Sequence, residues 1–485
     1  MFGGLAIAAV LTVHCAGLDT GDDCTDYDTC KGLNEAGAGD GSDGGKEGGP
    51  VIPPTCDLTK AVKDSPDCVD DGVGVFVSPA GDDTAPGTKG KPVRSITKAA
   101  EIAASVSKPR VYICAGTYTD SVDVKQAISF YGGFTCNGEQ WSLTGAGVLW
   151  NAVKPDFGLR IVGAGQRVAV EDVEITAKDA SLPGQSSIGI FVADTSALSL
   201  SRVTVIAGKG INGETKVKKS IGPNASKGSP AANPTGGAGA KNVCPDGDSQ
   251  GGKGSSLGSN DATAGQPALG GGVAGADSTD CLAGGAGTNG GNGAPGDAAV
   301  GIVALGTLTR DGWNPAAGTA GKPGSRAQGG GGGGARGGAG GGGGAGGCGG
   351  TGGEPGSGGG ASVAVVALST PVTANASKLR SGTAGNGGGG AGGQPGQPPG
   401  GGGGGGSGPT FDGCSGGSGG TGGPGGAGGG GAGGVSAAIL YKGPTPVTSD
   451  SQLTKGTAGT RGLGGDLTAT ADGPDGQAAE LLAIP

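Results

Sequence analysis

The sequence has little of what an ordinary globular core needs. Of 485 residues only 34% are hydrophobic and 3% aromatic, whereas glycine (122) and proline (29) together supply nearly a third of the chain. This composition excludes one large globular core and by itself is typical of low-complexity disorder. Positive charge is also scarce, since 32 basic residues stand against 41 acidic ones, for a net charge of −9. We therefore expect no nucleic-acid partner and no electrostatic attraction to an anionic membrane.

Motifs for metals and cofactors are missing as well. His14 is the single histidine and no CxxC pair occurs, which argues against a zinc site. The acidic segment 19–43 lacks the closing glutamate of a twelve-residue calcium loop, so a solvated tether is the preferred interpretation and cation chelation the alternative. Nucleotide-type glycine patterns carry no weight in a chain this rich in glycine. The sequence predicts no cofactor and no metal.

The N-terminus resembles an export signal. Residues 3–13 are apolar but too few to span a bilayer as a helix. The following "LTVHC" resembles the lipobox of bacterial lipoproteins, in which the cysteine, here Cys15, becomes the lipid-bearing N-terminus. The resemblance implies a signal over residues 1–15, a tether over 16–74, and a bacterial cell envelope location, at the outer membrane or the extracellular surface. A lipid on Cys15 would be the only contact with the membrane; a plain signal peptide is the alternative.

Eleven cysteines suit an oxidising compartment, and an even ten remain when Cys15 is set aside. Sequence cannot determine their connectivity. Pairing of neighbours would give Cys24 with Cys30, Cys56 with Cys68, Cys114 with Cys136, Cys244 with Cys281, and Cys348 with Cys414.

Residues 75–215 change in character from the tether. A short strand and a Gly/Pro loop precede a helix that Ser95 can cap and that repeats Ile96, Ala99, Ala100 and Ala103 on one face. Short runs of alternating apolar and polar residues follow, separated by glycine or polar corners. They are "RVYICAGTY", "AISFYGGF", "GLRIVGAG", "RVAVEDVEIT", "IGIFVA" and "LSLSRVTVIA". Regular short strands of this kind predict a solenoid in which stacked coils share one core.

The opening "VSPAGDDTAPGTKGKPVRSITKAA" followed by "RVYICAGTY" resembles the right-handed parallel β-helix, or pectin-lyase-like, proteins. The resemblance implies an all-β solenoid whose helix covers the apolar end coil and its unpaired strand edges. It covers residues 75 to about 215 and indicates fold more than activity.

The glycine-rich part, 216–485, contains an internal repeat. Stems over 188–210, 300–321, 363–385 and 437–459 each open with an apolar strand and close on a glycine step. We expect β-helix coils interrupted by glycine-rich arms, at roughly 214–297, 325–360 and 388–434. Triplets such as "GGSGGTGGPGGA" suit a threefold polyproline II-type helix, so the arms are expected either as ordered polyglycine II or as disordered loops. They resemble the glycine-rich domains of PE-PGRS proteins.

Enzyme chemistry has weak candidates only. Pectin-lyase-like folds host lyases and glycosidases, which need paired carboxylates or a basic residue beside acids. Asp172 and Glu174 would share one face of a strand, and Arg202 is the basic residue nearest Asp194 in the chain. A solvated strand face is the simpler interpretation. We therefore expect an exported structural or adhesive surface protein, binding glycans, cell-surface proteins or itself. A polysaccharide lyase or hydrolase is the alternative.

Overall fold

The computed structural model describes residues 52–485 except 278–279, 282–284 and 467–468. Cys15, Cys24, Cys30 and most of the tether therefore lie outside the described residues. Residues 49–485 fall into one unit. Within the described part, no helix has both the length and the apolar character needed to cross a membrane.

The entry to the fold is a strand and a capped helix. Two 3₁₀ turns, Val62–Asp64 and Pro66–Cys68, precede strand β1 (Gly74–Val77). Helix α1 (Ile96–Ser105) begins where the Ser95 hydroxyl accepts a hydrogen bond from the Lys98 amide (3.2 Å). The face predicted to be apolar is the buried one, and the helix packs on β1 and its neighbours. The predicted helix is confirmed.

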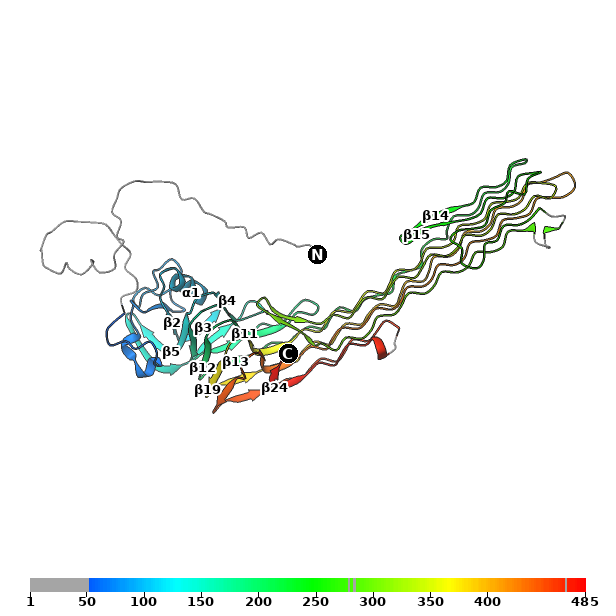
Figure 1. The fold of residues 1–485 in the computed structure, drawn as a ribbon. Helices are drawn as coiled ribbons and strands as arrows, with labels where there is room; N and C mark the ends of the chain where they lie inside the picture. Colours follow the sequence, from blue (N-terminus) through cyan, green and yellow to red (C-terminus); the bar gives the residue numbers. More distant parts are fainter. Residues whose placement is uncertain (1–51, 278–279, 282–284, 467–468) are drawn as a thin grey trace, which may run out of the picture. The chain divides into compact units, whose positions relative to one another are not determined.

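The strands form three main sheets, each with a ladder of parallel pairs (Figure 1). Sheet A contains β1, β2 (Arg110–Cys114), β5 (Ser129–Asn137), β9 (Arg167–Glu171), β12 (Ala197–Ser201), β19 (Val372–Asn375) and β22 (Val447–Ser449), with β6 (Gln140–Ala146) antiparallel to β5. Sheet B contains β3 (Gly116–Thr119), β7 (Val148–Asn151), β10 (Glu174–Thr176), β13 (Thr204–Ile206), β20 (Lys378–Arg380) and β23 (Gln452–Thr454). Sheet C contains β4 (Val122–Val124), β8 (Leu159–Val162), β11 (Ser187–Ala193), β18 (Ser362–Leu368), β21 (Ser436–Lys442) and β24 (Ala478–Ala483).

The chain visits sheets A, B and C in turn and then returns to A, beginning with β2, β3 and β4. All six strand-like runs found in the sequence are strands here, so the predicted all-β class with parallel sheets is confirmed. The strand order is consistent with a β-helix. Equivalent apolar residues stack from coil to coil inside the three sheets, as Ile190, Val365 and Ile439 do along sheet C. This shared interior makes one core from short strands that could not each bury a face alone.

The corners between sheets repeat a backbone conformation. Where the chain turns from A to B, Asp172, Arg202, Ala376 and Asp450 all have φ between 48° and 54°. Each of these residues lies between an A strand and the B strand that follows it. A positive φ strains most residues, although aspartate tolerates it better than most. The repeated positive φ at these four positions therefore marks the turn from sheet A to sheet B.

Long segments leave the sheets at one place in the circuit, between a B strand and the next C strand. They follow β13, β20 and β23 and return before β18, β21 and β24. The prediction that stem 300–321 forms a coil like the other three stems is wrong. Those residues form an antiparallel hairpin, β16 (Gly306–Thr309) with β17 (Gly312–Pro315), whose strands pair only with each other. A similar hairpin, β14 (Lys241–Cys244) with β15 (Gly247–Gln250), lies in the same excursion.

The excursions contain extended segments that run side by side (Figure 1). Over residues 340–345 successive amides donate in turn to three different neighbouring segments, and the bonds to segment 414–432 recur at every third residue from Gly341 to Gly359. One repeat runs from Gly341 N to Cys414 O (2.9 Å), from Gly342 N to Ser229 O (2.9 Å) and from Gly343 N to Gly252 O (2.8 Å). We call these hydrogen-bonded segments, between 208 and 476, the glycine bundle.

Glycine is required inside the glycine bundle because backbone packs on backbone. A Cβ added at Gly341, Gly343 or Gly344 would come within 2.0 to 2.1 Å of a carbonyl oxygen of a neighbouring segment. No real Cβ contact is that short, so the neighbouring chain would have to move. The conformational entropy lost by glycine is offset here by backbone hydrogen bonds on several sides.

Four disulfides stabilise the described chain. Cys56–Cys68 and Cys114–Cys136 form as neighbour pairing predicts. In the excursions neighbour pairing is wrong, because Cys244 bonds to Cys348 and Cys281 bonds to Cys414. The reason is spatial: segments over 100 residues apart in sequence lie side by side in the glycine bundle. Each of these two disulfides therefore joins separate segments.

Candidate functional site

The sequence-predicted acidic and basic residues meet at one corner. Arg202 Nε and Nη2 bind both carboxylate oxygens of Asp172 (2.6 and 2.7 Å), and Nη2 also lies 3.1 Å from Glu171 Oε2. Asp172 and Arg202 occupy equivalent corner positions in consecutive coils, both with φ of 54°. The pair therefore ties one coil to the next.

Glu174 lies near this pair, whereas Asp194 does not join it. Glu174 begins β10 and lines an open depression of about 200 Å³ together with Asp172 and Arg202. Asp194 follows β11 at the corner from sheet C to sheet A and forms an ion pair with Arg310 of the β16–β17 turn. The structure thus brings three of the four candidates together and engages Asp194 elsewhere.

Glu171 precedes Asp172 in the same "VEDVEIT" run and is a third carboxyl group of this corner. It ends β9 and is buried on the outer side of sheet A. Burial raises the pKa of Glu171, while the guanidinium of Arg202 opposes that rise. A carboxyl group with a raised pKa beside a second carboxyl group, here that of Asp172, is an arrangement that acid–base enzymes use.

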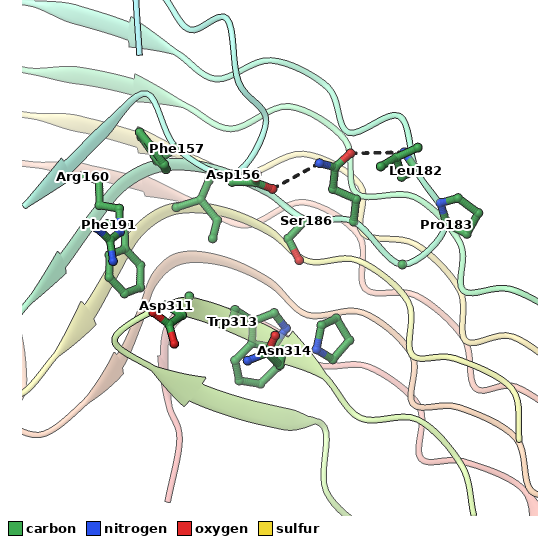
Figure 2. A pocket seen from close by; sticks show the side chains of 15 residues that line it. Asp156, Phe157, Arg160, Leu182, Pro183, Ser186, Phe191, Asp311, Trp313 and Asn314 are labelled. Atoms are coloured by element: carbon green, nitrogen blue, oxygen red, sulfur yellow. Dashed lines mark hydrogen bonds between the residues drawn. The ribbon is translucent and has the colours of Figure 1, made fainter. Parts of the chain in front are cut away.

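A larger cleft lies on the outer face of sheet C, beneath the β16–β17 hairpin (Figure 2). Its volume is about 430 Å³, within the range of about 300–1,000 Å³ typical of ligand pockets. Figure 2 shows Asp311, Trp313 and Asn314 of the hairpin on one side of the cleft and Asp156, Leu182 and Ser186 on the other.

The cleft floor is aromatic and apolar. Phe191 and Ile188 point outward from β11 and pack with Trp313 and Leu308 of the hairpin in one buried cluster. Phe157, half-buried, borders the same cluster. The Trp313 ring lies directly over Gly306, where a Cβ would come within 2.5 Å of Cζ2. Glycine at this position therefore lets the tryptophan lie flat against its partner strand.

Two contacts hold the hairpin turn on the sheet. Arg160 of β8 donates from Nη2 to the Arg310 carbonyl oxygen (2.8 Å), while its Nη1 binds Asp123 of β4 (3.1 Å). The side chain of Arg310 in turn binds Asp194. These contacts span neighbouring strands of sheet C, so the cleft is preformed by the fold.

The remaining polar groups of the cleft are sparsely paired. Asp156 Oδ1 accepts a hydrogen bond from Gln185 Nε2 (3.2 Å). Trp313 Nε1 is buried without a hydrogen-bond partner among the described residues. Within that same part of the chain, the exposed side chains of Asp311 and Asn314 make no hydrogen bond or ion pair.

The cleft could not be predicted while residues 300–321 were expected to form a coil. A signal was present: "RDG" at 310–312 and "PDG" at 245–247 are both Asp-Gly turns, which are strong hairpin indicators. In both hairpins the glycine follows a two-residue loop and has positive φ (137° at Gly312, 119° at Gly247). Trp313, one of three tryptophans in the chain, directly follows such a turn.

No described group of three or more histidine, cysteine, aspartate or glutamate side chains is arranged to hold a metal ion.

Residues 79–238 match the model of one protein family, described as a protein of unknown function (DUF1565). The match spans helix α1, the coils up to β13 and the start of the first excursion. No curated protein and no solved structure matches the chain. The chain is thus similar over about a third of its length to a family whose description assigns no activity.

Proposed function

We propose that this chain is an exported bacterial envelope protein with a structural or adhesive role, anchored through a lipid on Cys15. In this proposal residues 75–215 and the later coils form a right-handed parallel β-helix, and the glycine bundle is a polyglycine II insertion presented as a contact surface. The observation that carries the proposal is the hydrogen bonding of residues 340–345 to three neighbours in turn, with the bonds to segment 414–432 continuing at every third residue to Gly359.

A threefold repeat supports polyglycine II because a helix with three residues per turn directs successive amides to three sides. At about 3.1 Å per residue, segment 338–360 would span roughly 70 Å. Glycines inside the bundle contact neighbouring carbonyls, and its surface carries backbone groups and small side chains together with exposed apolar side chains such as Val217, Val273 and Phe411. Such a surface suits broad contact by hydrogen bonds with glycans, with other surface chains or with a second copy. The resemblance to PE-PGRS glycine-rich domains agrees with display at a cell surface.

The lipid anchor is tested on the native protein. The N-terminal peptide is isolated from membranes of the native host and its mass determined. A diacylated or triacylated Cys15 would support the anchor and make residues 16–74 a tether. A free N-terminus after residue 13 would contradict the anchor and leave a secreted protein.

The adhesive role is tested by deleting residues 388–434. Gly434 N donates to Gly385 O (2.9 Å), so the ends to be joined already lie together. Strands β20 and β21 retain their partners β13 and β18, and we expect the coils to fold. Adhesion of coated beads to envelope glycans or to beads of the same protein should be lost. Unchanged adhesion with an intact far-UV spectrum would contradict the proposal.

A polysaccharide-processing enzyme is the second candidate, favoured by the raised pKa of Glu171 beside Asp172. Glycoside hydrolysis requires one protonated and one ionised carboxyl group. Reducing-end release from a polysaccharide panel should then fall in Glu171→Gln, Asp172→Asn and Glu174→Gln, with Asp194→Asn, which pairs with Arg310 at another corner, as a matched control. Absence of cleavage by the unsubstituted protein would remove this candidate.

A further inference from the structure

The buried indole of Trp313 lacks a partner that its chemistry requires. A tryptophan N–H in the protein interior normally finds an acceptor, and leaving one unpaired costs about 1–3 kcal/mol. Trp313 is 6% exposed, lines the cleft under the β16–β17 hairpin, and its Nε1 has no acceptor among the described residues. The Nε1 atom is covered by its surroundings, so an oxygen supplied from outside the chain would pair with it once the hairpin shifts enough to open the indole to the cleft.

The cleft rim offers hydrogen bonds of both kinds. Asp156 uses one carboxylate oxygen for Gln185, and the Asp311 carboxylate and the Asn314 amide project without partners in the described chain. A molecule bearing several hydroxyl groups can donate to the carboxylates and accept from the amide and the indole. The apolar lining by Phe157 and Leu182 suits the C–H surface of the same molecule.

The charges of the cleft argue against an anionic occupant. Arg160 is the only cation that lines it, and both terminal nitrogens of Arg160 are already engaged, one by Asp123 and one by the Arg310 carbonyl. Asp156 and Asp311 are then the charged groups that face an occupant. A carboxylated or sulfated ligand would meet like charge.

We propose that this cleft is a binding site for a neutral oligosaccharide. One sugar hydroxyl accepts from Trp313 Nε1, others donate to Asp156 and Asp311, and the C–H face of a ring packs on the apolar lining. The proposed ligand contacts come from the hairpin and from the loop before β8, so the site does not depend on adhesion by the glycine bundle.

The test uses the full-length exported protein with its disulfides intact. Maltotriose, cellotriose and chitotriose, with trigalacturonate as the anionic comparison, are titrated at millimolar concentrations and followed by calorimetry. We expect at least one neutral trisaccharide to bind and trigalacturonate not to bind. No binding of any neutral trisaccharide, or preferential binding of trigalacturonate, would overturn the proposal.

Variants then assign the binding to the cleft. Trp313→Phe keeps an aromatic ring but removes the N–H and should weaken affinity about 2- to 12-fold, the value of one neutral hydrogen bond. The matched control is Trp141→Phe, because the Trp141 indole donates to Lys89 O at another place in the fold. Equal affinity in the two variants, or an equal loss in both, would overturn the assignment.

Asp311→Asn keeps the test decisive if Trp313→Phe disturbs the hairpin, since the Asp311 side chain is exposed and Asn-Gly suits a hairpin turn as Asp-Gly does. Affinity should fall at least about tenfold, because a hydrogen bond to a charged group is lost. Unchanged affinity in Asp311→Asn would count against the site. Trp313→Phe separates the two proposals, because it should weaken trisaccharide binding and leave bead adhesion by the glycine bundle unchanged.

Discussion

The substitution Gly343→Ala puts the backbone packing of the glycine bundle to a direct test. The new Cβ would lie 2.0 Å from Gly330 O and 2.7 Å from Gly330 C, so a backbone segment, not a side chain, must move. Overpacking of this kind costs about 1–3 kcal/mol. Separation of the segments would also break the bond from Gly343 N to Gly252 O (2.8 Å) and that from Ala240 N to Gly343 O (3.0 Å), at about 0.5–1.5 kcal/mol each. The expected loss is about 2–6 kcal/mol.

Hydrogen exchange followed by mass spectrometry measures this loss locally, because amide exchange reports the free energy of opening. A loss of only about 2 kcal/mol speeds exchange about 25-fold in peptides covering 338–360. The control is Gly404→Ala in the same bundle, where a Cβ meets no atom within 4 Å. It should be neutral, or stabilising by about 0.4–1 kcal/mol through the unfolded chain. Equal exchange in the two variants would refute the reasoning that side chains are excluded from the bundle interior.

Three further perturbations have expected outcomes. Ser95→Ala removes the cap of helix α1 and should cost about 1 kcal/mol, read from the denaturant midpoint; Ser95→Thr should recover most of it. Replacing Cys244 and Cys348 together by serine removes a disulfide between residues 104 positions apart and should lower the free energy of unfolding by up to about 4.7 kcal/mol. Amide exchange in 241–250 should become faster, and unchanged protection there would contradict the prediction. Burial raises the pKa of Glu171, so the folded state binds more protons than the unfolded state and loses stability as the pH rises through the raised pKa. Glu171→Gln should remove this loss of stability, which unfolding curves across pH 4 to 7 would measure. The same pH dependence in the variant and in the unsubstituted protein would contradict the prediction.

The elements that could be predicted are those whose signal is local. The apolar face of α1 and its serine cap are contained within eleven residues, and the strand runs of 110–207 alternate in a way that only a pleated strand satisfies. Segment 300–321 resembles the other three stems in apolar content, but its Asp-Gly turn makes the strand pair with itself as a hairpin instead of continuing from sheet to sheet. The candidate cleft depended on that assignment and was missed with it.

The corner residues show that local sequence also fails to predict which single side chains pair. Asp172 and Arg202 are 30 residues apart, and only the stacking of one coil on the next makes them an ion pair. Asp194 has Arg202 as its nearest basic residue in sequence, yet it pairs with Arg310, which the hairpin brings from 116 residues away. Sequence proximity therefore selected a partner that the fold assigns to a different carboxylate.

By itself the sequence determined that this protein is built from short strands with a capped helix at their start, that its core is thin, and that its glycine-rich segments return repeatedly to strands of one pattern. Alternation, capping and composition act over a few residues, so no tertiary information is needed to see them. The tertiary structure alone decided which segments lie together. It pairs Cys244 with Cys348 and Cys281 with Cys414, directs the amides of successive glycines to different neighbours, and folds a hairpin over sheet C to form the Trp313 cleft. A glycine tract has no side chains to specify its partners, so its register follows from the strands that bound it and from the backbone contacts made when those strands stack.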